Sequence, residues 1–396
     1  MKLLFYRYNN ICEPDIIATF NEFGYEVREF TLEMTKKDVP ASEVVKKVSE
    51  YLQNDPVDFV FSINFYPALS EVCNIFHIRY ISWTVDSPVP EIYSKSIINE
   101  WNRTFIFDKE DYNEVNAICE KEGSGHVFHL PLAARTEPKE ELFKNTPQSI
   151  HDKFSHDVAF VGSLYTEKCP YDKLVGMPEE MSGYLDGVMR AQERVYGYYF
   201  VEDLITQEVI DAFKTHMPDY LTYKDDSFIT DAKMIANYYV GNKISSLERF
   251  DILSRLSEKF DVSLYTMSDT GKLPKVHNMG PAKTLTEMPV IFRNSKINLN
   301  PTSKGIRAGL PLRIFDIMSA GGFVLSNFQT ELGDLFDMGQ DLAVYSSLDE
   351  LEYLTDYYLV HDDERRMIAE NGYMKVKENY SYQKVLSNMI FKAYEV

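Results

Sequence analysis

The stretch "TSKGIRAGLPLR", residues 302 to 313, contains the residue types that bind an anion. Its charged residues are Lys304, Arg307 and Arg313, with no acid among them, although the chain has a formal net charge of −20. Arginine presents a planar set of N–H donors that matches phosphate oxygens. The next residues, "LPLRIFDIMSA", read as a helix, and a helix N-terminus favours negative charge. The pattern predicts a pyrophosphate site in which Asp316 accepts hydrogen bonds from ribose hydroxyls. The alternative is a set of solvated charges with an ion pair inside the helix.

Alternating strands and helices must position this loop. The strand "NSKINLN" precedes it, and "GG" and the strand "FVLSN" follow its helix. The first ~130 residues alternate in the same way, from "KLLFYR" to "HVFHL", and the pattern returns in "DVSLYT" and "LAVYS". Such alternation predicts parallel, doubly wound sheets, whose functional loops follow the carboxyl ends of the strands.

The chain divides into two such domains and a final helix. We expect an N-terminal Rossmann-like domain over residues 1–135, followed by a linker near 131–155, where prolines and charges show no periodicity. A second Rossmann-like domain is predicted over 156–380, with a helical insert at about 165–260. Residues 381–396 read as a closing helix, because Val385, Met389, Ile390 and Ala393 recur at helical spacing.

Composition excludes several classes of function. The charge of −20 argues against nucleic acid and against an anionic membrane surface. The four cysteines form no CxxC pair, which indicates a reducing compartment and gives no zinc signature. No apolar run approaches ~18 residues, and the N-terminus turns polar too early for a signal peptide. We therefore expect a cytoplasmic protein with no membrane insertion.

The stretch "DIMSAGGFV" resembles the donor-binding region of GT-B glycosyltransferases, with Asp316 in the place of the ribose-binding acid. Over nearly its whole length the chain is similar to the spore-maturation (CgeB-type) group of bacterial glycosyltransferases. The motifs that support this resemblance are "FSINFYPALSEVC", "YISWTVDSP", "FIFDKEDY", "VAFVGSLY", "INLNPT" and "RIFDIMSAGGFVLSN".

The resemblance implies two Rossmann-like domains facing a cleft, with the closing helix packed back on the first domain. It implies a nucleotide-diphosphate sugar as co-substrate, a UDP- or dTDP-sugar, together with a protein or glycan acceptor and no metal or other cofactor. The expected donor-binding residues are Gly162, Ser163, Lys168, Asn300, Lys304, Arg307, Arg313, Asp316 and Gly321.

Two positions depart from the GT-B pattern. Ala308 occupies the position of a second glutamate that contacts the sugar in many retaining enzymes, which leaves the stereochemical outcome open. Ser163 occupies the position of an arginine in the first strand-loop of the second domain, whereas Lys168 matches the expected lysine. Phosphate neutralisation is then expected to depend more on Arg307 and Arg313.

Glycosyl transfer also needs a group that deprotonates the acceptor, when the reaction inverts configuration. Asp86, just after a predicted buried strand, is the first candidate for the catalytic base, and an Asx turn is its alternative role. His129 is the second candidate, with a core position as its alternative. Asn64 is expected on the acceptor side, where it orients the acceptor or caps a helix. Asp108 and Asp111 suggest a metal pair, but a helix N-cap explains them more simply.

Two other functions are compatible with the sequence. A nucleotide-sugar epimerase of GT-B-like fold would need paired catalytic carboxylates, and the sequence shows no convincing pair. A two-lobed solute-binding protein would be exported, and no export signal is visible.

Overall fold

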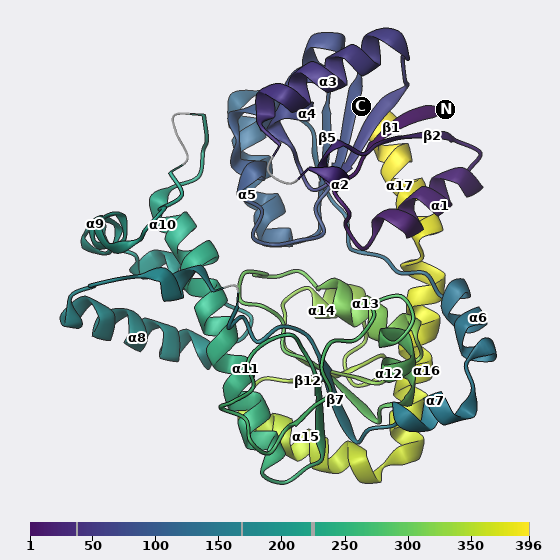
Figure 1. Cartoon of the computed structure of the whole chain (residues 1–396), viewed down its shortest axis with the longest axis vertical. Coiled ribbons are helices and arrows are strands. Elements are labelled where there is room, and N and C mark those ends of the chain that lie inside the picture. The colour runs from purple at the N-terminus through teal and green to yellow at the C-terminus, as the bar shows by residue number, and fades with distance from the viewer. Residues whose placement is uncertain (37–38, 168, 223–225, 396) are drawn as a thin grey trace. The chain divides into compact units, whose positions relative to one another are not determined.

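A computed structural model describes residues 1–36, 39–167, 169–222 and 226–395 of the chain (Figure 1). The chain forms two compact units. Unit 1 contains residues 1–133, 223–229 and 381–396, and unit 2 contains residues 134–222 and 230–380. No helix in the described part of the chain is both long and apolar enough to cross a membrane.

Unit 1 is built on a six-stranded parallel sheet in the order β2-β1-β3-β4-β5-β6. Its strands are β1 (Lys2–Tyr6), β2 (Glu26–Phe30), β3 (Phe59–Ile63), β4 (Arg79–Trp83), β5 (Asn102–Ile106) and β6 (Val127–His129). The main helices are α1 (Glu13–Glu22), α3 (Ala41–Asn54), α4 (Pro67–Phe76), α5 (Lys109–Glu122) and α17 (Tyr382–Glu395), with the short α2 (Leu32–Thr35) and the 3-10 helices η1 (Pro90–Tyr93) and η2 (Lys95–Ile98). Strands β3 and β5 are buried throughout, as expected for a sheet covered on both faces.

The closing helix α17 is part of unit 1 and lies beside α1 (Figure 1). The ring of Tyr382 packs edge-on against Trp83 at 6.2 Å between centroids. Near the other end of the helix, the Arg79 guanidinium lies 4.2 Å from the centre of the Tyr394 ring. Arg103 Nε donates a hydrogen bond to the Ala393 carbonyl at 3.2 Å. The last helix therefore completes one face of the sheet of unit 1.

Unit 2 contains a second parallel sheet, in the order β12-β11-β10-β7-β8-β9. Its strands are β7 (Val158–Val161), β8 (Val262–Tyr265), β9 (His277–Asn278), β10 (Ile297–Asn300), β11 (Val324–Asn327) and β12 (Ala343–Tyr345). The covering helices are α11 (Gly241–Ser257), α12 (Met288–Asn294), α13 (Leu312–Ser319), α14 (Leu332–Leu335), α15 (Leu348–Val360) and α16 (Asp362–Asn379). Both sheets confirm the predicted doubly wound α/β class.

The insert of unit 2 is helical. It contains η3 (Pro170–Lys173), α8 (Glu179–Glu193), η4 (Glu202–Leu204), α9 (Gln207–His216), α10 (Asp231–Lys233) and a π-helix, η5 (Met234–Val240), which runs into α11. Residues 223–229 interrupt this insert and belong to unit 1. There, the Phe228 N–H donates to the Tyr93 carbonyl at 2.7 Å, and the Lys95 N–H donates to the Asp226 carbonyl at 2.8 Å.

The predicted linker near residues 131–155 is instead mostly helical. It forms α6 (Glu137–Asn145) and α7 (Gln148–Lys153) within unit 2. Neither helix buries a residue completely, so the apolar pattern of both is weak in the sequence. Contacts with α12 and α16 hold them: the Arg293 guanidinium lies 4.5 Å from the centre of the Phe143 ring, and Lys377 Nζ is 2.8 Å from Glu140 Oε1.

Candidate functional site

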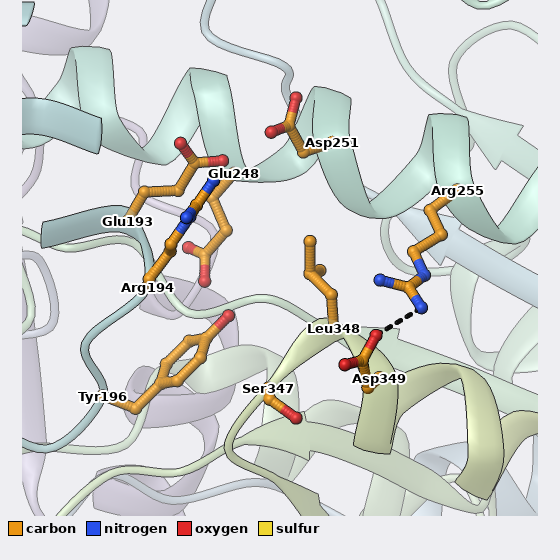
Figure 2. Close-up of a pocket in the computed structure, with 9 residues that line it drawn as sticks. All are labelled: Glu193, Arg194, Tyr196, Glu248, Asp251, Arg255, Ser347, Leu348 and Asp349. Carbon is orange, nitrogen blue, oxygen red and sulfur yellow. Dashed lines mark hydrogen bonds and ion pairs between the residues drawn. The ribbon is translucent and has the colours of Figure 1, made fainter. Parts of the chain in front are cut away.

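A cavity of about 310 Å³ lies in unit 2 between the end of α8, α11 and the start of α15 (Figure 2). Its walls are formed by Glu193, Arg194, Tyr196, Glu248, Asp251, Arg255, Ser347, Leu348 and Asp349. Among the residues that the structure describes, none of those predicted from the sequence to bind the donor lines this cavity. They lie instead at the end of β10, on the loops after β7 and β10, on α13 and in the turn after α13.

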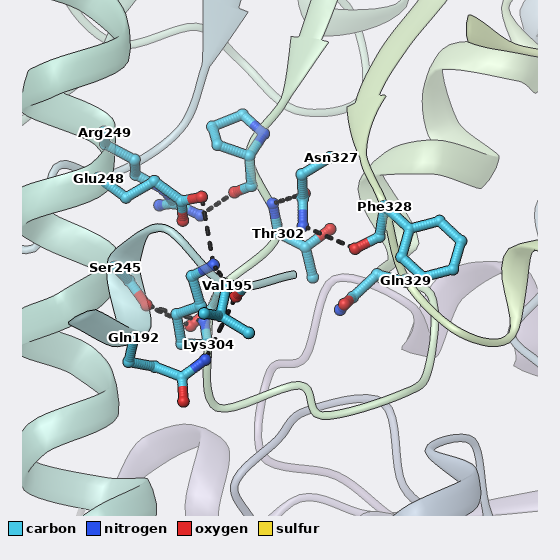
Figure 3. A network of polar contacts seen from close by, with 12 residues as sticks. Gln192, Val195, Ser245, Glu248, Arg249, Thr302, Lys304, Asn327, Phe328 and Gln329 are labelled. Atoms are coloured by element: carbon cyan, nitrogen blue, oxygen red, sulfur yellow. Dashed lines mark hydrogen bonds and ion pairs between the residues drawn. The ribbon is translucent and has the colours of Figure 1, made fainter. Parts of the chain in front are cut away.

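The loop after β10 is fixed at its start by neighbouring strand ends. Asn300 Nδ2 donates to Thr302 Oγ1 at 2.9 Å and to Ser326 Oγ at 3.0 Å. The Thr302 N–H donates to Asn327 Oδ1 at 2.7 Å (Figure 3). Asn300 is therefore buried, and its side-chain hydrogen bonds connect the ends of β10 and β11.

Arg249 of α11 joins this loop to the loop after β7. Its Nη1 donates to the Ser163 carbonyl at 2.6 Å and its Nη2 to the Pro301 carbonyl at 2.9 Å. The guanidinium also lies 4.7 Å from the centre of the Tyr165 ring. Arg249 therefore places a positive charge beside Ser163, the position at which the GT-B pattern has an arginine.

Lys304 is held in a buried ion pair. Its Nζ lies 3.3 Å from Glu248 Oε1 and 4.1 Å from the centre of the Tyr196 ring, and its side chain is only 8% exposed (Figure 3). This finding corrects the expectation that the Lys304 side chain is available to a diphosphate. The sequence could not show the pairing, because Glu248 lies on another element.

Arg313 and Asp316 lie one turn apart on α13. Arg313 is partly buried: its Nη1 is 3.8 Å from Met288 Sδ, and its guanidinium is 5.2 Å from the centre of the Phe292 ring. Burial lowers the pKa of Arg313, against the opposing effect of the Asp316 charge, and the nearby Arg249 lowers it further. Because charge is unfavourable in these surroundings, an anion placed here would be stabilised by Arg313.

The Asp316 carboxylate is about one-third exposed, at 32%, and lies 3.9 Å from Lys139 Nζ. Lys139 is on α6, in the segment that the sequence suggested was a linker, and it also donates to Ser319 Oγ. A partly exposed carboxylate beside an ammonium group can still accept hydrogen bonds from ligand hydroxyls, because it has two oxygens with several lone pairs.

Four predicted donor residues remain. Gly162 follows β7 directly, and its N–H donates to the Tyr265 carbonyl at 3.0 Å. Arg307 is partly buried, and its charge opposes the raised pKa that burial gives Tyr199 of the insert. Gly321 has a φ of +75° in the turn from α13 to β11, so its role here is in the backbone. Lys168 lies outside the described residues.

In unit 1 the structure brings Asn64 and Asp86 together at the carboxyl ends of β3 and β4. Asn64 Nδ2 donates to Asp86 Oδ2 at 2.8 Å and to Tyr8 Oη at 3.1 Å. Asn64 Oδ1 accepts from the Val85 N–H at 3.0 Å. Asn64 has a left-handed backbone with a φ of +59°, which asparagine tolerates better than most residues. Its side chain therefore orients the exposed Asp86.

Tyr8 is an acceptor-side candidate that the sequence reasoning missed. The loop after β1 folds around Glu13, which is 1% exposed and accepts from the Tyr8 N–H at 2.8 Å and the Asn10 N–H at 3.0 Å. Burial raises the pKa of Tyr8, and the Asp86 charge raises it further. Tyr8 therefore remains a neutral hydroxyl near Asp86. The only sequence signal for it is a tyrosine two residues after the first strand.

His129 does not join this group. It ends β6, which β5 separates from β4, and its Nε2 lies 3.2 Å from the Phe107 carbonyl oxygen. Asp108 is the N-cap of α5 and accepts from the N–H groups of Glu110 and Asp111 at 3.0 and 3.2 Å, which confirms the cap interpretation. Within the described residues, no group of three or more acidic, histidine or cysteine side chains is arranged to hold a metal ion.

Comparison with known proteins adds family information for the second half of the chain. Residues 248–390 match a family model described as glycosyl transferase-like. This region contains the second part of α11, the loop after β10, and the Arg313 and Asp316 pair on α13. No curated protein sequence is significantly similar to the chain.

The whole chain superposes on solved glycosyltransferase structures. Anabaena Alr3699/HepE, solved with UDP and glucose, is 11% identical to this chain. The superposition covers 100% of both chains and gives a TM-score of 0.54. A glycosyltransferase from Rickettsia africae ESF-5 is also 11% identical, with 100% of this chain and 98% of that chain covered and a TM-score of 0.54. Sucrose-phosphate synthase from Thermosynechococcus elongatus is 9% identical, with coverages of 99% and 100% and a TM-score of 0.53. The chain has the GT-B fold. At these identities the solved structures show a similarity of fold alone. Similarity in sequence comes from the match of residues 248–390 to the family model.

Proposed function

We propose that this protein is a cytoplasmic glycosyltransferase that moves a hexosyl group from a UDP- or dTDP-sugar to a protein or glycan acceptor. The observation that supports this most directly is the glycosyl transferase-like match of residues 248–390, which contains both Arg313 and Asp316. The solved Anabaena protein of the same fold was crystallised with UDP-glucose. The finer likeness to the spore-maturation group depends on the motifs alone.

In this proposal unit 2 binds the donor. Asp316 accepts hydrogen bonds from the ribose, and the α13 N-terminus, Arg313 and Arg307 bind the diphosphate, with Arg249 adding charge beside Ser163. As the glycosidic C–O bond breaks, negative charge grows on the leaving diphosphate, and positive groups fixed in advance stabilise it most. We propose that these groups act without a metal ion.

Unit 1 supplies the acceptor-side groups. Asp86, oriented by Asn64, takes the proton from the attacking hydroxyl while that oxygen forms the new bond to the anomeric carbon. This role requires an inverting reaction. In a retaining reaction, Asp86 would only bind the acceptor.

Screening nucleoside diphosphates by thermal shift and calorimetry tests the proposal. We expect UDP or dTDP to raise the unfolding temperature. We also expect the protein to release the nucleoside diphosphate from the matching nucleotide sugar when EDTA is present. A protein that no nucleotide stabilises would point to a solute-binding role instead. Turnover that is lost in EDTA and restored by manganese or magnesium would refute the metal-independent mechanism. Conversion of the sugar with no transfer would indicate an epimerase.

A further inference from the structure

Tyr8 lies between two asparagines of unit 1, and both direct a side-chain N–H group at its hydroxyl. Asn10 Nδ2 lies 2.9 Å from Tyr8 Oη, and Asn64 Nδ2 lies 3.1 Å from it. The orientation of each amide is fixed through its oxygen. Asn10 Oδ1 accepts from the Cys12 N–H at 2.9 Å, and Asn64 Oδ1 accepts from the Val85 N–H at 3.0 Å. Neither amide can turn over without losing that bond, so both nitrogens must donate to Tyr8.

The Tyr8 hydroxyl is therefore left with one hydrogen-bonding role, that of a donor. The amides of Asn10 and Asn64 occupy its oxygen as an acceptor, and no described residue accepts from its O–H group. Burial and the Asp86 charge raise the pKa of Tyr8, so the hydroxyl keeps its hydrogen at neutral pH. Its ring packs against the Tyr66 ring at 5.9 Å between centroids. Tyr8 thus presents a fixed O–H donor to any ligand of this face.

Asp86 presents an acceptor close to this donor. Its Oδ2 lies 2.8 Å from the same Asn64 nitrogen that binds Tyr8. Because one nitrogen binds both oxygens, Asp86 Oδ2 and Tyr8 Oη lie within about 6 Å of each other. Asp86 is exposed, and its Oδ1 accepts from no described residue. The group therefore offers a ligand one acceptor and one donor, side by side.

Two neighbouring hydroxyl groups of a sugar ring fit this arrangement. One hydroxyl can donate to Asp86 while the oxygen of its neighbour accepts from the Tyr8 O–H group. The ring holds the two oxygens at a fixed separation, so little conformational entropy is lost when both contacts form. A serine or threonine side chain has a single hydroxyl, and it could offer Tyr8 a second oxygen only by fixing torsions of its own peptide backbone.

From this geometry we propose that the acceptor is a sugar bound through two neighbouring hydroxyl groups, and that Tyr8 is the residue that selects it. This inference rests on the proposed function. In the transfer step, the hydroxyl that faces Asp86 gives its proton to Oδ1 while its oxygen forms the bond to the anomeric carbon. The electron pair of the broken C–O bond leaves with the nucleoside diphosphate. Tyr8 donates to the neighbouring oxygen throughout and transfers no proton.

NMR titration of the full chain tests the proposal with the methyl glycosides of glucose, galactose and mannose. Each glycoside is compared with its 3-deoxy analogue, in which no two ring hydroxyls are neighbours. At least one glycoside should bind about three- to tenfold more tightly than its analogue, the usual effect of one neutral hydrogen bond. In Tyr8→Phe this difference should disappear. Tyr51→Phe, which removes a unit 1 hydroxyl that donates to Asp55, is the matched control and should keep the difference.

UDP binding is measured in parallel, because its absence would refute the proposed function itself. In a protein that binds UDP, the absence of binding by every glycoside would overturn this inference alone. Equal binding of all glycosides and their 3-deoxy analogues would also overturn it, as would N-acetylserine methylamide binding as tightly as the best glycoside.

A structural role for Tyr8 gives a different result. Tyr8→Phe would then weaken the glycoside and its 3-deoxy analogue by the same factor, and the unchanged ratio would overturn the assignment to Tyr8. The substitution keeps the ring that packs on Tyr66, so the variant should fold. The comparison of the two probes on the wild-type protein needs no variant and can refute the inference by itself.

Discussion

Replacing Arg313 with methionine separates a donor-binding role from a structural one. Methionine keeps an unbranched apolar side chain beside Met288 and Phe292 and removes the guanidinium, with its charge and its N–H donors. If Arg313 contacts the diphosphate, the loss of one charge-assisted contact costs about 1.5–3 kcal/mol. That range corresponds to about 10- to 150-fold weaker UDP binding.

The stability of the unliganded protein should change in the opposite direction or not at all. Burial lowers the pKa of Arg313, which means that the folded state disfavours its charged form. Arg313→Met removes this unfavourable charge, so thermal unfolding without nucleotide should occur at the same temperature or higher. A residue needed only for packing or ion pairing would instead lower the unfolding temperature and leave the affinity unchanged.

Calorimetry with UDP at fixed ionic strength, together with thermal unfolding with and without UDP, measures both effects. Arg293→Met is the matched control, because Arg293 also packs on an aromatic ring in unit 2 but is not a proposed donor residue. Unchanged UDP affinity in folded Arg313→Met protein would refute the assignment of Arg313 to the donor site.

Three further predictions concern unit 1 and the cavity. Asp86→Asn should lower kcat by about 10²- to 10⁴-fold, and Asn64→Ala should lower kcat less. Neither substitution should change the affinity for UDP. Normal turnover of Asp86→Asn in a nucleotide-release assay would exclude Asp86 as the base. Deleting residues 381–396 uncovers Trp83, and it should destabilise unit 1 and abolish transfer while UDP still binds, as followed by circular dichroism, a transfer assay and calorimetry. Full transfer activity in the truncated protein would contradict this. Because the pKa of Glu193 is raised to about 7, its contribution to stability is present at acidic pH and is lost as pH rises through about 7. Glu193→Gln should therefore remove about 1–3 kcal/mol of this pH dependence, measured by urea unfolding at two pH values, and an unchanged pH dependence would contradict the assignment.

Sequence patterns were sufficient for the two sheets, because buried parallel strands are short apolar runs between helices. Strands β3 and β5, for example, are visible as "VDFVFSI" and "RTFIFD". The patterns failed where tertiary contacts decide the structure. Helices α6 and α7 depend on partners in α12 and α16, and residues 226–229 pair with the Tyr93 region through backbone groups that any sequence possesses.

The candidate site shows the same division. Asn64 and Asp86 follow neighbouring strands, so the topology alone places them at one edge, and the structure adds the 2.8 Å contact. The partner of Lys304 could not be predicted, because the choice between Glu248 and a ligand phosphate depends on how α11 lies against the loop.

We propose that Arg249, which lies outside the motif, compensates for the absence of the arginine at position 163. The sequence has Ser163 at the position of an expected arginine, which suggested a weaker phosphate site. In the structure, α11 brings the Arg249 guanidinium within 2.6 Å of the Ser163 carbonyl oxygen. Two of its five N–H groups are used by the carbonyls of Ser163 and Pro301, which fixes the plane of the guanidinium between the two loops. Because its guanidinium is already fixed, Arg249 loses little further conformational entropy when an anion binds. In this proposal a helix residue takes the role of a loop arginine, although the two positions share no sequence pattern.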